Sequence, residues 1–378
     1  MNRTVNTKFR RYLSLLLVVM LLVSVIPASA AADGVDAKYL LFTSDTHNVP
    51  AGNLYANKTA ERLGPWITSV SETLGGVQFD TMGFCGDMGS AIDGTAGYWT
   101  AARNVMDAAE NNSAVGRVVY TYGNHDSGVP GSGKDPMEDY YYCTSKMTQC
   151  GGCHYDGYSI FCIGVRENCY QSFDSSDIAV MSDFLKGCPA DEPVFIVSHY
   201  PLHSTATRPI YNGGTVISML NNYPNVVFLW GHNHTEVDPH YGNVYTGRLD
   251  NTPIKFTYAS AGAMVDKDYG EPQSAQILSK GLAVRINSDD TLTFMYFDLN
   301  GKMLSSTNVS SGDTEPAAIR QTLFTRITRS LLKNSLVQQI MSKLSDTFLG
   351  GGDINSFLQD VRASVNDYIK GLIPIKAC

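Results

Sequence analysis

Charged residues are scarce in this chain, and the features that mark several special classes of protein are missing. Only 17% of the 378 residues are Asp, Glu, Lys or Arg, whereas 43% are hydrophobic. This balance excludes a disordered chain, and the composition fits neither collagen nor a coiled coil. No internal repeat is visible. The length allows a substantial core, either in one large domain with an appendage or in two domains.

Beyond the first thirty residues, no apolar run is long enough to span a bilayer. Residues 1–30 combine a basic start without any acid, an apolar run at 13–26 and the small residues Ala28-Ser29-Ala30, an order typical of a cleaved export signal. A membrane anchor is the less favoured alternative, because a spanning helix needs about 20 apolar residues. We therefore expect a signal peptide at 1–30, no transmembrane anchor after cleavage, and a secreted, extracellular or periplasmic protein.

Positive charge is also in short supply. The expected leader contains four basic residues and no acidic one, so its removal changes the formal net charge from −8 to −12. Such a surface disfavours nucleic acid and anionic lipid, and we expect no nucleic-acid binding. A site for an anionic ligand must then create its positive potential locally, as bound metal ions can.

The chain has eight cysteines but lacks the second close pair that usually completes a zinc site. In an exported protein, a cluster at 143–188 is typical of disulfides, and six cysteines allow 15 pairings. Cys150-x-x-Cys153-His154 leaves metal binding or haem attachment open as less favoured alternatives. Cys85 is expected in the core, and Cys378 has no obvious partner. The clustered cysteines are Cys143, Cys150, Cys153, Cys162, Cys169 and Cys188.

From Lys38 onward, short apolar runs alternate with more polar, helix-compatible segments. Runs that are apolar on both faces are typical of strands covered on both sides, which predicts a layered α/β fold. Further strands are expected at 254–260, 282–287 and 291–298, the last two joined by a turn at 288–290. The earlier runs are Tyr39–Thr43, Thr81–Cys85, Arg117–Tyr122, Tyr158–Val165, Val194–Val197 and Val226–Trp230.

The end of the chain has a different pattern. A polar, Gly- and Ser-rich stretch at 305–313 predicts a boundary after a domain at 38–300. Beyond it, apolar residues recur near every 3.6 positions, with an interruption at Gly350-Gly351-Gly352. We expect 313–378 to form a small helical appendage that packs on the core, in preference to a membrane- or partner-binding segment.

Residues able to bind metal follow five of the expected strands. Because the carboxyl ends of parallel strands meet in one crevice, ligands that are distant in the sequence can converge there. The five motifs are Asp45-x-His47, Gly86-Asp87, Gly123-Asn124-His125-Asp126, His199-Tyr200-Pro201 and Gly231-His232-Asn233-His234.

These side chains fit the chemistry of a two-metal centre. Asp45 and His47 are two residues apart, so both can face one ion, and a carboxylate such as Asp87 can bridge two ions about 3.5–4 Å apart. Asn124 offers an amide oxygen, and the remaining ligands are imidazoles. This mixture suits Zn, Mn or Fe better than Ca or Mg alone.

The five motifs together resemble those of the calcineurin-like metallophosphoesterase superfamily, over about residues 38–300. The resemblance implies a β-sandwich flanked by helices, with two divalent metal ions. It implies that Asp45, His47 and His234 hold one ion, that Asn124, His199 and His232 hold the other, and that Asp87 bridges them. His125 would contact the phosphate or assist the leaving group, and Asp126 would either orient His125 or cap the loop.

The resulting hypothesis is an exported hydrolase of phosphoric ester bonds, with a small-molecule phosphate ester as its partner. A metal-bridging hydroxide would attack phosphorus while His125 assists the leaving oxygen. Ser90 stands where purple acid phosphatases have a tyrosine ligand, which disfavours an iron–tyrosinate site; His203 is a further residue in reach of substrate. Hydrolysis of nucleotide or phospholipid-headgroup diesters is the alternative, followed by a non-catalytic binding protein. The sequence leaves the oligomeric state open.

Overall fold

The computed structural model describes residues 37–48, 59–89, 97–126, 137–166, 169, 171–204, 208–233, 244–265, 280–289 and 291–310. All of them belong to one compact unit that spans residues 35–314. The expected leader, the expected helices at 313–378, His234 and Cys378 lie outside the described residues. Among those described, no helix has the length and apolar character needed to cross a membrane.

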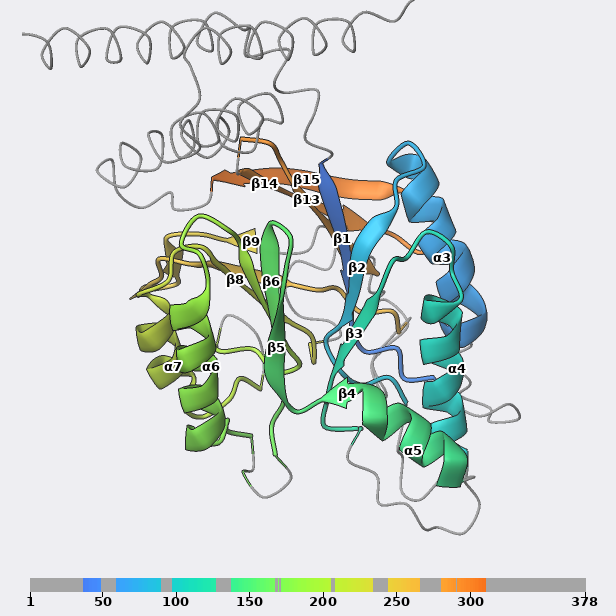
Figure 1. Ribbon diagram of the computed structural model, residues 1–378, viewed down its shortest axis with the longest axis horizontal. Helices are drawn as coiled ribbons and strands as arrows, with labels where there is room; N and C mark the ends of the chain where they lie inside the picture. Colours follow the sequence, from blue (N-terminus) through green and yellow to red (C-terminus); the bar gives the residue numbers. More distant parts are fainter. Residues whose placement is uncertain are drawn as a thin grey trace, which may run out of the picture. The chain divides into compact units, whose positions relative to one another are not determined.

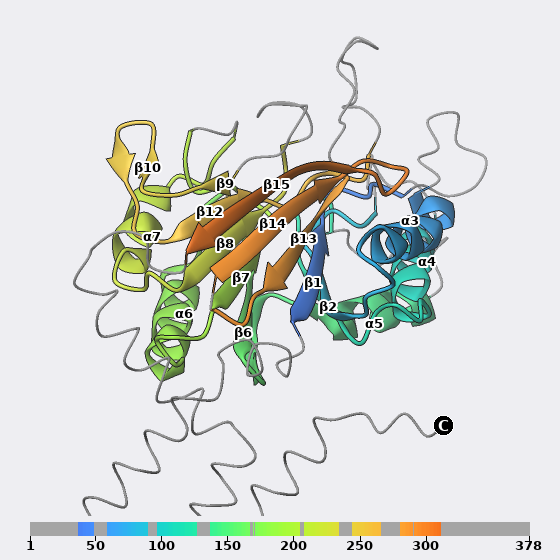
Figure 2. The same cartoon turned by 90° about the horizontal axis from the view of Figure 1, so that it is seen from above.

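Two β-sheets face each other at the centre of this unit (Figures 1 and 2). The first has seven strands in the order β15-β14-β13-β1-β2-β3-β4. Its β1 to β4 segment is parallel, whereas β13, β14 and β15 join antiparallel. The strands are β1 (Lys38–Thr43), β2 (Phe79–Phe84), β3 (Val118–Thr121), β4 (Met147–Thr148), β13 (Gly281–Ile286), β14 (Thr291–Phe297) and β15 (Met303–Ser310).

The second sheet has six strands in the order β5-β6-β7-β8-β12-β9. Strands β6, β7, β8 and β12 are parallel, and β5 and β9 are antiparallel edges. A short separate hairpin joins β10 (Arg248–Leu249) to β11 (Thr252–Pro253). The strands of the second sheet are β5 (Cys150–Tyr155), β6 (Tyr158–Ile163), β7 (Val194–Ser198), β8 (Val226–Trp230), β9 (Val244–Tyr245) and β12 (Thr257–Ser260).

Helices cover the outer face of each sheet, so the unit has four layers (Figure 1). Helices α3 (Thr59–Thr73), α4 (Tyr98–Glu110) and α5 (Met137–Lys146) lie beside the first sheet. Helices α6 (Ser175–Gly187) and α7 (Gly213–Leu220) lie beside the second. Three apolar clusters fill the spaces between helices and first sheet, between the sheets, and between second sheet and helices. The expected β-sandwich flanked by helices is confirmed.

All nine strands that the apolar runs predicted are present, with ends shifted by a few residues. The polar boundary expected at 305–313 is wrong for residues 305–310, because these belong to β15. That strand pairs with β14 at the edge of the first sheet, and Ser306, Thr307 and Asn308 are exposed there. An edge strand can carry polar side chains without burying them, so its amino-acid composition can resemble that of a linker.

The expectation of disulfides is not met in the described part of the chain, where none of the seven cysteines forms a disulfide bond. The fold distributes the clustered cysteines over different layers. Cys143 is buried on α5 against the first sheet, whereas Cys162 lies in the cluster between the two sheets. Cys150 and Cys188 pack on the helix side of the second sheet. These four thiols are therefore divided among three layers, and none of the described cysteines belongs to a metal-ligand group.

Candidate metal centre

The expected ligands follow the carboxyl ends of five parallel strands, three in the first sheet and two in the second. The loop after β1 carries Asp45 and His47, and the loop after β2 carries Asp87. The remaining residues follow β3, β7 and β8. The structure brings together Asp45, His47, Asp87, Asn124, His125, His199 and His232, whereas His234 lies outside the described residues.

The backbone of these loops is strained. Among the described residues, seven non-glycine residues have a positive φ, and four of them are expected ligands. A positive φ is unfavourable for a residue with a Cβ atom, and such strain clusters at functional sites. Backbone hydrogen bonds hold the first loops together, from Asp45 N to Gly86 O at 3.1 Å and from His47 N to Asp87 O at 3.1 Å. The four strained ligands are Asp45, His47, Asp87 and His232.

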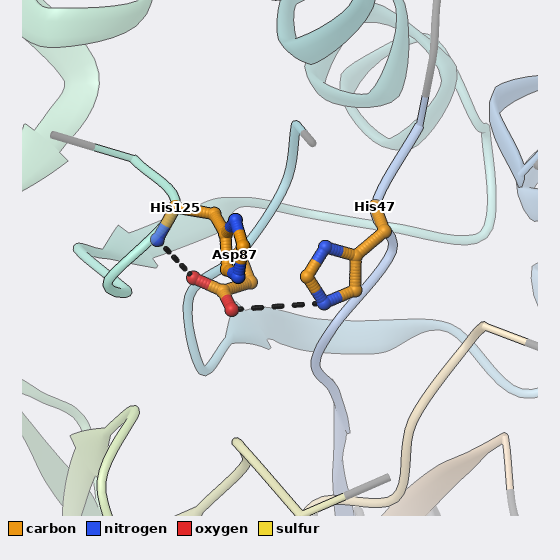
Figure 3. Close-up of side chains that lie close together, drawn as sticks. All are labelled: His47, Asp87 and His125. Carbon is orange, nitrogen blue, oxygen red and sulfur yellow. Dashed lines mark hydrogen bonds and ion pairs between the residues drawn. The ribbon is translucent and has the colours of Figure 1, made fainter. Parts of the chain in front are cut away.

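His47, Asp87 and His125 form the first group of side chains able to hold a cation (Figure 3). His47 Nε2 lies 3.6 Å from Asp87 Oδ2. The backbone N–H of His125 donates to Asp87 Oδ1 at 2.8 Å, and the imidazoles of His125 and His47 meet edge to face at 4.9 Å. His47 and Asp87 are fully buried, while His125 is partly exposed. His125 is thus the member of this group that faces outward.

Asp87, His199 and His232 form the second group, which joins the two sheets. His199 Nε2 lies 3.2 Å from Asp87 Oδ2, 2.9 Å from Asn124 Oδ1 and 3.0 Å from His232 Nδ1. His199 Nδ1 lies 2.7 Å from Cys85 O. A carbonyl oxygen only accepts hydrogen bonds, so Nδ1 must donate and Nε2 is directed at the other ligands.

The buried charges of this centre shift one another's pKa values. Burial opposes ionisation of Asp87, but the charge and hydrogen bond of His199, with smaller contributions from two other histidines, hold its pKa well below the usual range. Burial also opposes protonation of His199, yet Asp87 raises the pKa of His199 to about 9. Burial and the neighbouring His199 lower the pKa of His232 to about 3. The negative charge of Asp87 therefore favours the protonated form of His199, and burial beside His199 favours the neutral form of His232.

Asp45 connects the two sheets at the back of the centre. Its Oδ2 accepts a hydrogen bond from the backbone N–H of His232 at 2.8 Å, and its Oδ1 lies 3.7 Å from His47 Nε2. Gly231, just before His232, has no room for a side chain, because a Cβ there would lie 1.7 Å from Ser44 Oγ. The loops after β1 and β8 therefore pack directly on each other.

Asp126 holds the loops in place. Among the described residues, its carboxylate bonds to backbone N–H groups and to one tyrosine hydroxyl, and no bond to the ring of His125 is found. Its Oδ2 accepts from the N–H groups of Asp87 at 2.7 Å and Gly123 at 2.8 Å. Its Oδ1 accepts from Met88 N at 3.0 Å and from the hydroxyl of Tyr98 at 2.8 Å. Burial and the charge of Asp87 raise the pKa of Asp126 to about 6. These bonds favour loop capping, the second of the two roles considered for Asp126.

Further residues support the centre or lie near it. Tyr98 and Trp99, on α4, are both buried in the helix layer. Tyr98 supports the centre through Asp126, a role that the sequence does not signal. His203 Nε2 lies 3.2 Å from Thr252 Oγ1, on the small hairpin. Arg208 was not predicted, yet its Nη2 donates to the backbone carbonyl of His232 at 3.1 Å.

The chemistry of the donor set fits divalent cations. The imidazole and carboxylate atoms within each group all lie within 4.8 Å of one another, so one ion can contact all three. Both groups contain Asp87, whose Oδ2 lies 3.6 Å from His47 Nε2 and 3.2 Å from His199 Nε2. Mixed nitrogen and oxygen donors suit Zn, Mn or Fe. The buried carboxylates and imidazoles can therefore hold cations, as the sequence motifs predicted.

Comparisons with known proteins agree with this site. A family model described as calcineurin-like phosphoesterase matches residues 39–236. A comparison with curated protein sequences finds no match.

Three solved structures with a similar backbone fold each share 14% sequence identity with this chain. A purple acid phosphatase from yellow lupin (Lupinus luteus) seeds has a TM-score of 0.49, over 76% of this chain and 55% of that one. A hypothetical protein from Thermus thermophilus has a TM-score of 0.35, with 72% and 98% covered. A phosphopantetheinyl hydrolase from Mycobacterium tuberculosis also has 0.35, with 60% and 90% covered. This chain spans about half the length of the lupin enzyme.

The family assignment rests on the family match, which covers more than half of the 378 residues and includes the ends of the strands that carry the site. Within that span, residues from five separate motifs converge on one carboxylate, Asp87. The chain belongs to the calcineurin-like phosphoesterase family.

Proposed function

We propose that this protein hydrolyses phosphate esters at a centre that holds two divalent metal ions. The observation that carries the proposal is the position of Asp87, which belongs to two ligand groups at once. A carboxylate shared in this way suits a pair of ions about 3.5–4 Å apart. When bound, such ions generate a nucleophile from water at neutral pH and offset the negative charge that develops on the phosphoryl oxygens.

In this proposal the two sheets contribute different ligands. Asp45, His47 and Asp87 would hold the ion on the side of the first sheet, and His234, from the resemblance, would complete it. Asp87, Asn124, His199 and His232 would hold the other. The hydrogen bond from His199 Nδ1 to Cys85 O keeps Nε2 directed into the centre. Zn, Mn and Fe are the proposed metals.

His125 is the residue proposed to assist the leaving group. Its backbone is tied to Asp87 at 2.8 Å, which places the loop, while its imidazole is partly exposed beside His47. A histidine at the rim can transfer a proton to a departing oxygen. His125→Ala should therefore slow hydrolysis of an ester with a poor leaving group much more than hydrolysis of an aryl phosphate. Equal activity of the variant and the wild type on the poor leaving group would contradict this role.

Export is a separate proposal that rests only on the order of features in residues 1–30. We propose that the signal is cleaved near Ala30 and that the mature protein acts outside the cytoplasm. Amino-terminal sequencing of the protein recovered from the medium or periplasm tests it. An uncleaved chain retained in the cytoplasm would contradict the proposal without affecting the assigned chemistry.

The test of the proposed function uses the chain from Ala31 with p-nitrophenyl phosphate and bis-p-nitrophenyl phosphate, in Mn, Zn or EDTA. Asp87→Asn is measured in parallel, with Asp183→Asn as the control because Asp183 is exposed on α6. We expect metal-dependent hydrolysis that Asp87→Asn abolishes together with metal binding. Absence of both hydrolysis and bound metal in the wild-type protein would refute the proposal.

A further inference from the structure

An arginine that no sequence motif signalled reaches the second ligand group. Arg208 Nη2 donates to the carbonyl oxygen of His232 at 3.1 Å, and His232 Nδ1 lies 3.0 Å from His199 Nε2. The side chain of Arg208 is exposed, and its backbone has a φ of 53°. A positive φ in a residue with a long side chain is unfavourable and needs support from its surroundings. The strained backbone and the contact with His232 together place a guanidinium beside the centre.

The charge of Arg208 is not neutralised by a carboxylate of the described residues. No ion pair of Arg208 with any Asp or Glu occurs in the described ranges, in contrast to Arg103 and Arg166, which pair with Asp139 and Asp177. A guanidinium has five N–H donors, and the bond to His232 uses one of them. The other donors are able to bind an anion beside His232.

Tyr200 lies on the same side of the centre. Its ring packs against His232 with centroids 4.5 Å apart and meets His199 edge to face at 5.3 Å. Burial raises the pKa of its hydroxyl to about 12, with smaller contributions of opposite sign from Asp87 and Arg208. That hydroxyl has no hydrogen bond to a described residue, although the ring itself is largely buried. Tyr200 and Arg208 thus border His232 with a phenol and a guanidinium.

We propose that Arg208, assisted by the Tyr200 hydroxyl, binds the terminal phosphoryl oxygens of the substrate and makes this protein select phosphate monoesters over diesters. The fork of a guanidinium matches two oxygens of one phosphoryl group. A monoester carries a charge of about −1.5 to −2 and three terminal oxygens at pH 7, and a diester carries less charge and two such oxygens. Positive charge is scarce in the chain as a whole, so an exposed arginine beside the centre adds positive electrostatic potential locally.

This inference rests on the proposed function, and its test must separate the two. The variants are Arg208→Gln, Arg208→Lys and Tyr200→Phe. The control is Arg285→Gln, because Arg285 is also exposed but lies opposite Tyr39, at the other end of β1 from the ligands. Three quantities are measured for each protein: bound metal, affinity for inorganic phosphate by calorimetry, and kcat/KM for p-nitrophenyl phosphate and bis-p-nitrophenyl phosphate.

We expect Arg208→Gln to retain its metal, to bind phosphate about 10- to 100-fold more weakly, and to lose a similar factor in kcat/KM for the monoester. The diester should change by less than about threefold, since it carries less charge and lacks the third terminal oxygen, which leaves fewer oxygens for the guanidinium beside the proposed metal ions. Arg208→Lys should recover part of the affinity, because lysine keeps the charge but not the fork. Tyr200→Phe should show a smaller loss of the same kind.

Three outcomes would overturn the inference. Loss of metal in Arg208→Gln would show that Arg208 supports the His232 loop. Equal losses of kcat/KM for both esters would show that Arg208 does not select monoesters over diesters. Unchanged phosphate affinity would show that Arg208 does not bind the phosphoryl group. Wild-type protein that binds phosphate with its metals but hydrolyses neither ester would refute the proposed function instead, while the calorimetry of the Arg208 variants would still test the anion site.

Discussion

The two ligand groups differ in how the fold builds them. The first, His47, Asp87 and His125, comes entirely from loops that follow neighbouring strands of the first sheet. The second joins Asp87 to His199 and His232, which follow strands of the other sheet. The first group needs one correctly ordered sheet, whereas the second forms only when the two sheets pack face to face. The position of Asp87 in both groups therefore depends on the strand order within the first sheet and on the packing between the two sheets.

The sharpest way to separate the groups is to remove one histidine from each. His47→Ala should empty the first group and His232→Ala the second, so that bound metal falls from about two ions per chain to about one in each variant. Activity should fall at least about 100-fold, since loss of a residue that only hydrogen-bonds to a metal ligand can already lower metal affinity or activity by up to about 100-fold. Metal content by mass spectrometry and kcat on p-nitrophenyl phosphate test this.

His154→Ala is the control for these two variants, because His154 stacks on Phe184 away from the centre. It should retain the metal content and activity of the wild type. If His47→Ala and His232→Ala both kept two ions, or if each lost both ions, the division into two groups would be wrong.

Gly123→Ala should disturb both groups through Asp87 without removing a ligand. A Cβ at position 123 would lie 2.0 Å from Asp87 Oδ1 and 2.5 Å from Asp87 N, so the loop after β2 must move. A displacement of about 1 Å at a reacting centre can cost about 100-fold in rate. We expect a loss of that size in kcat/KM, with lower metal affinity.

Gly187→Ala is the matched control, because a Cβ there meets nothing within 4 Å. Its kcat/KM should equal that of the wild type. Full activity of Gly123→Ala would show that the loop after β2 can relax without moving Asp87.

Tyr98→Phe tests the support behind the shared carboxylate. It removes the hydroxyl that donates to Asp126 at 2.8 Å and leaves three backbone donors on that carboxylate. Loss of a hydrogen bond to a charged group should lower the free energy of unfolding by about 1.5–3 kcal/mol. Activity should fall much less than in Gly123→Ala. Urea unfolding tests this, with Tyr141→Phe as the control because Tyr141 is exposed. Equal stabilities of the two variants would contradict the role of Tyr98.

The smallest expected effect is a pH dependence that belongs to the second group. Burial works against protonation, but Asp87 raises the pKa of His199 to about 9, whereas an unfolded histidine has a pKa of about 6.5. The raised pKa stabilises the metal-free fold fully below pH 6.5, and this stabilisation is lost as the pH rises toward 9. The free energy of unfolding in EDTA should fall by about 1 kcal/mol per pH unit between pH 6.5 and 8. His199→Gln should remove this slope, and a slope that persisted in the variant would belong to other groups.

The clustering of the expected ligands was largely predictable because their sequence signal is local. Each ligand follows a strand-length apolar run, and parallel strands direct their carboxyl ends to one edge. This logic located Asp45, His47, Asp87 and His125 without knowledge of the sheet order. Tyr98 and Arg208 were not predictable in this way, since their contacts with Asp126 and His232 connect residues from different elements across the fold.

The cysteine-rich segment shows the opposite case. Six thiols within 46 residues suggest disulfides when only spacing is considered. The fold places Cys143 on a helix, Cys162 between the sheets and Cys150 on the outer face of the second sheet. Alternation of side chains along strands, together with the layer to which each element belongs, separates residues that are neighbours in the sequence.

The strands, their order along the chain and the chemical nature of the candidate ligands can be read from the apolar runs and from the residues that directly follow them. Which candidate ligands share Asp87 depends on the packing of two sheets, and this packing appears only in the folded protein. It also decided the strained backbone at Asp45, His47 and His232, which local sequence disfavours and the surrounding contacts impose. Contacts between residues far apart in the chain leave no local pattern in the sequence, and so they are visible only in the folded structure.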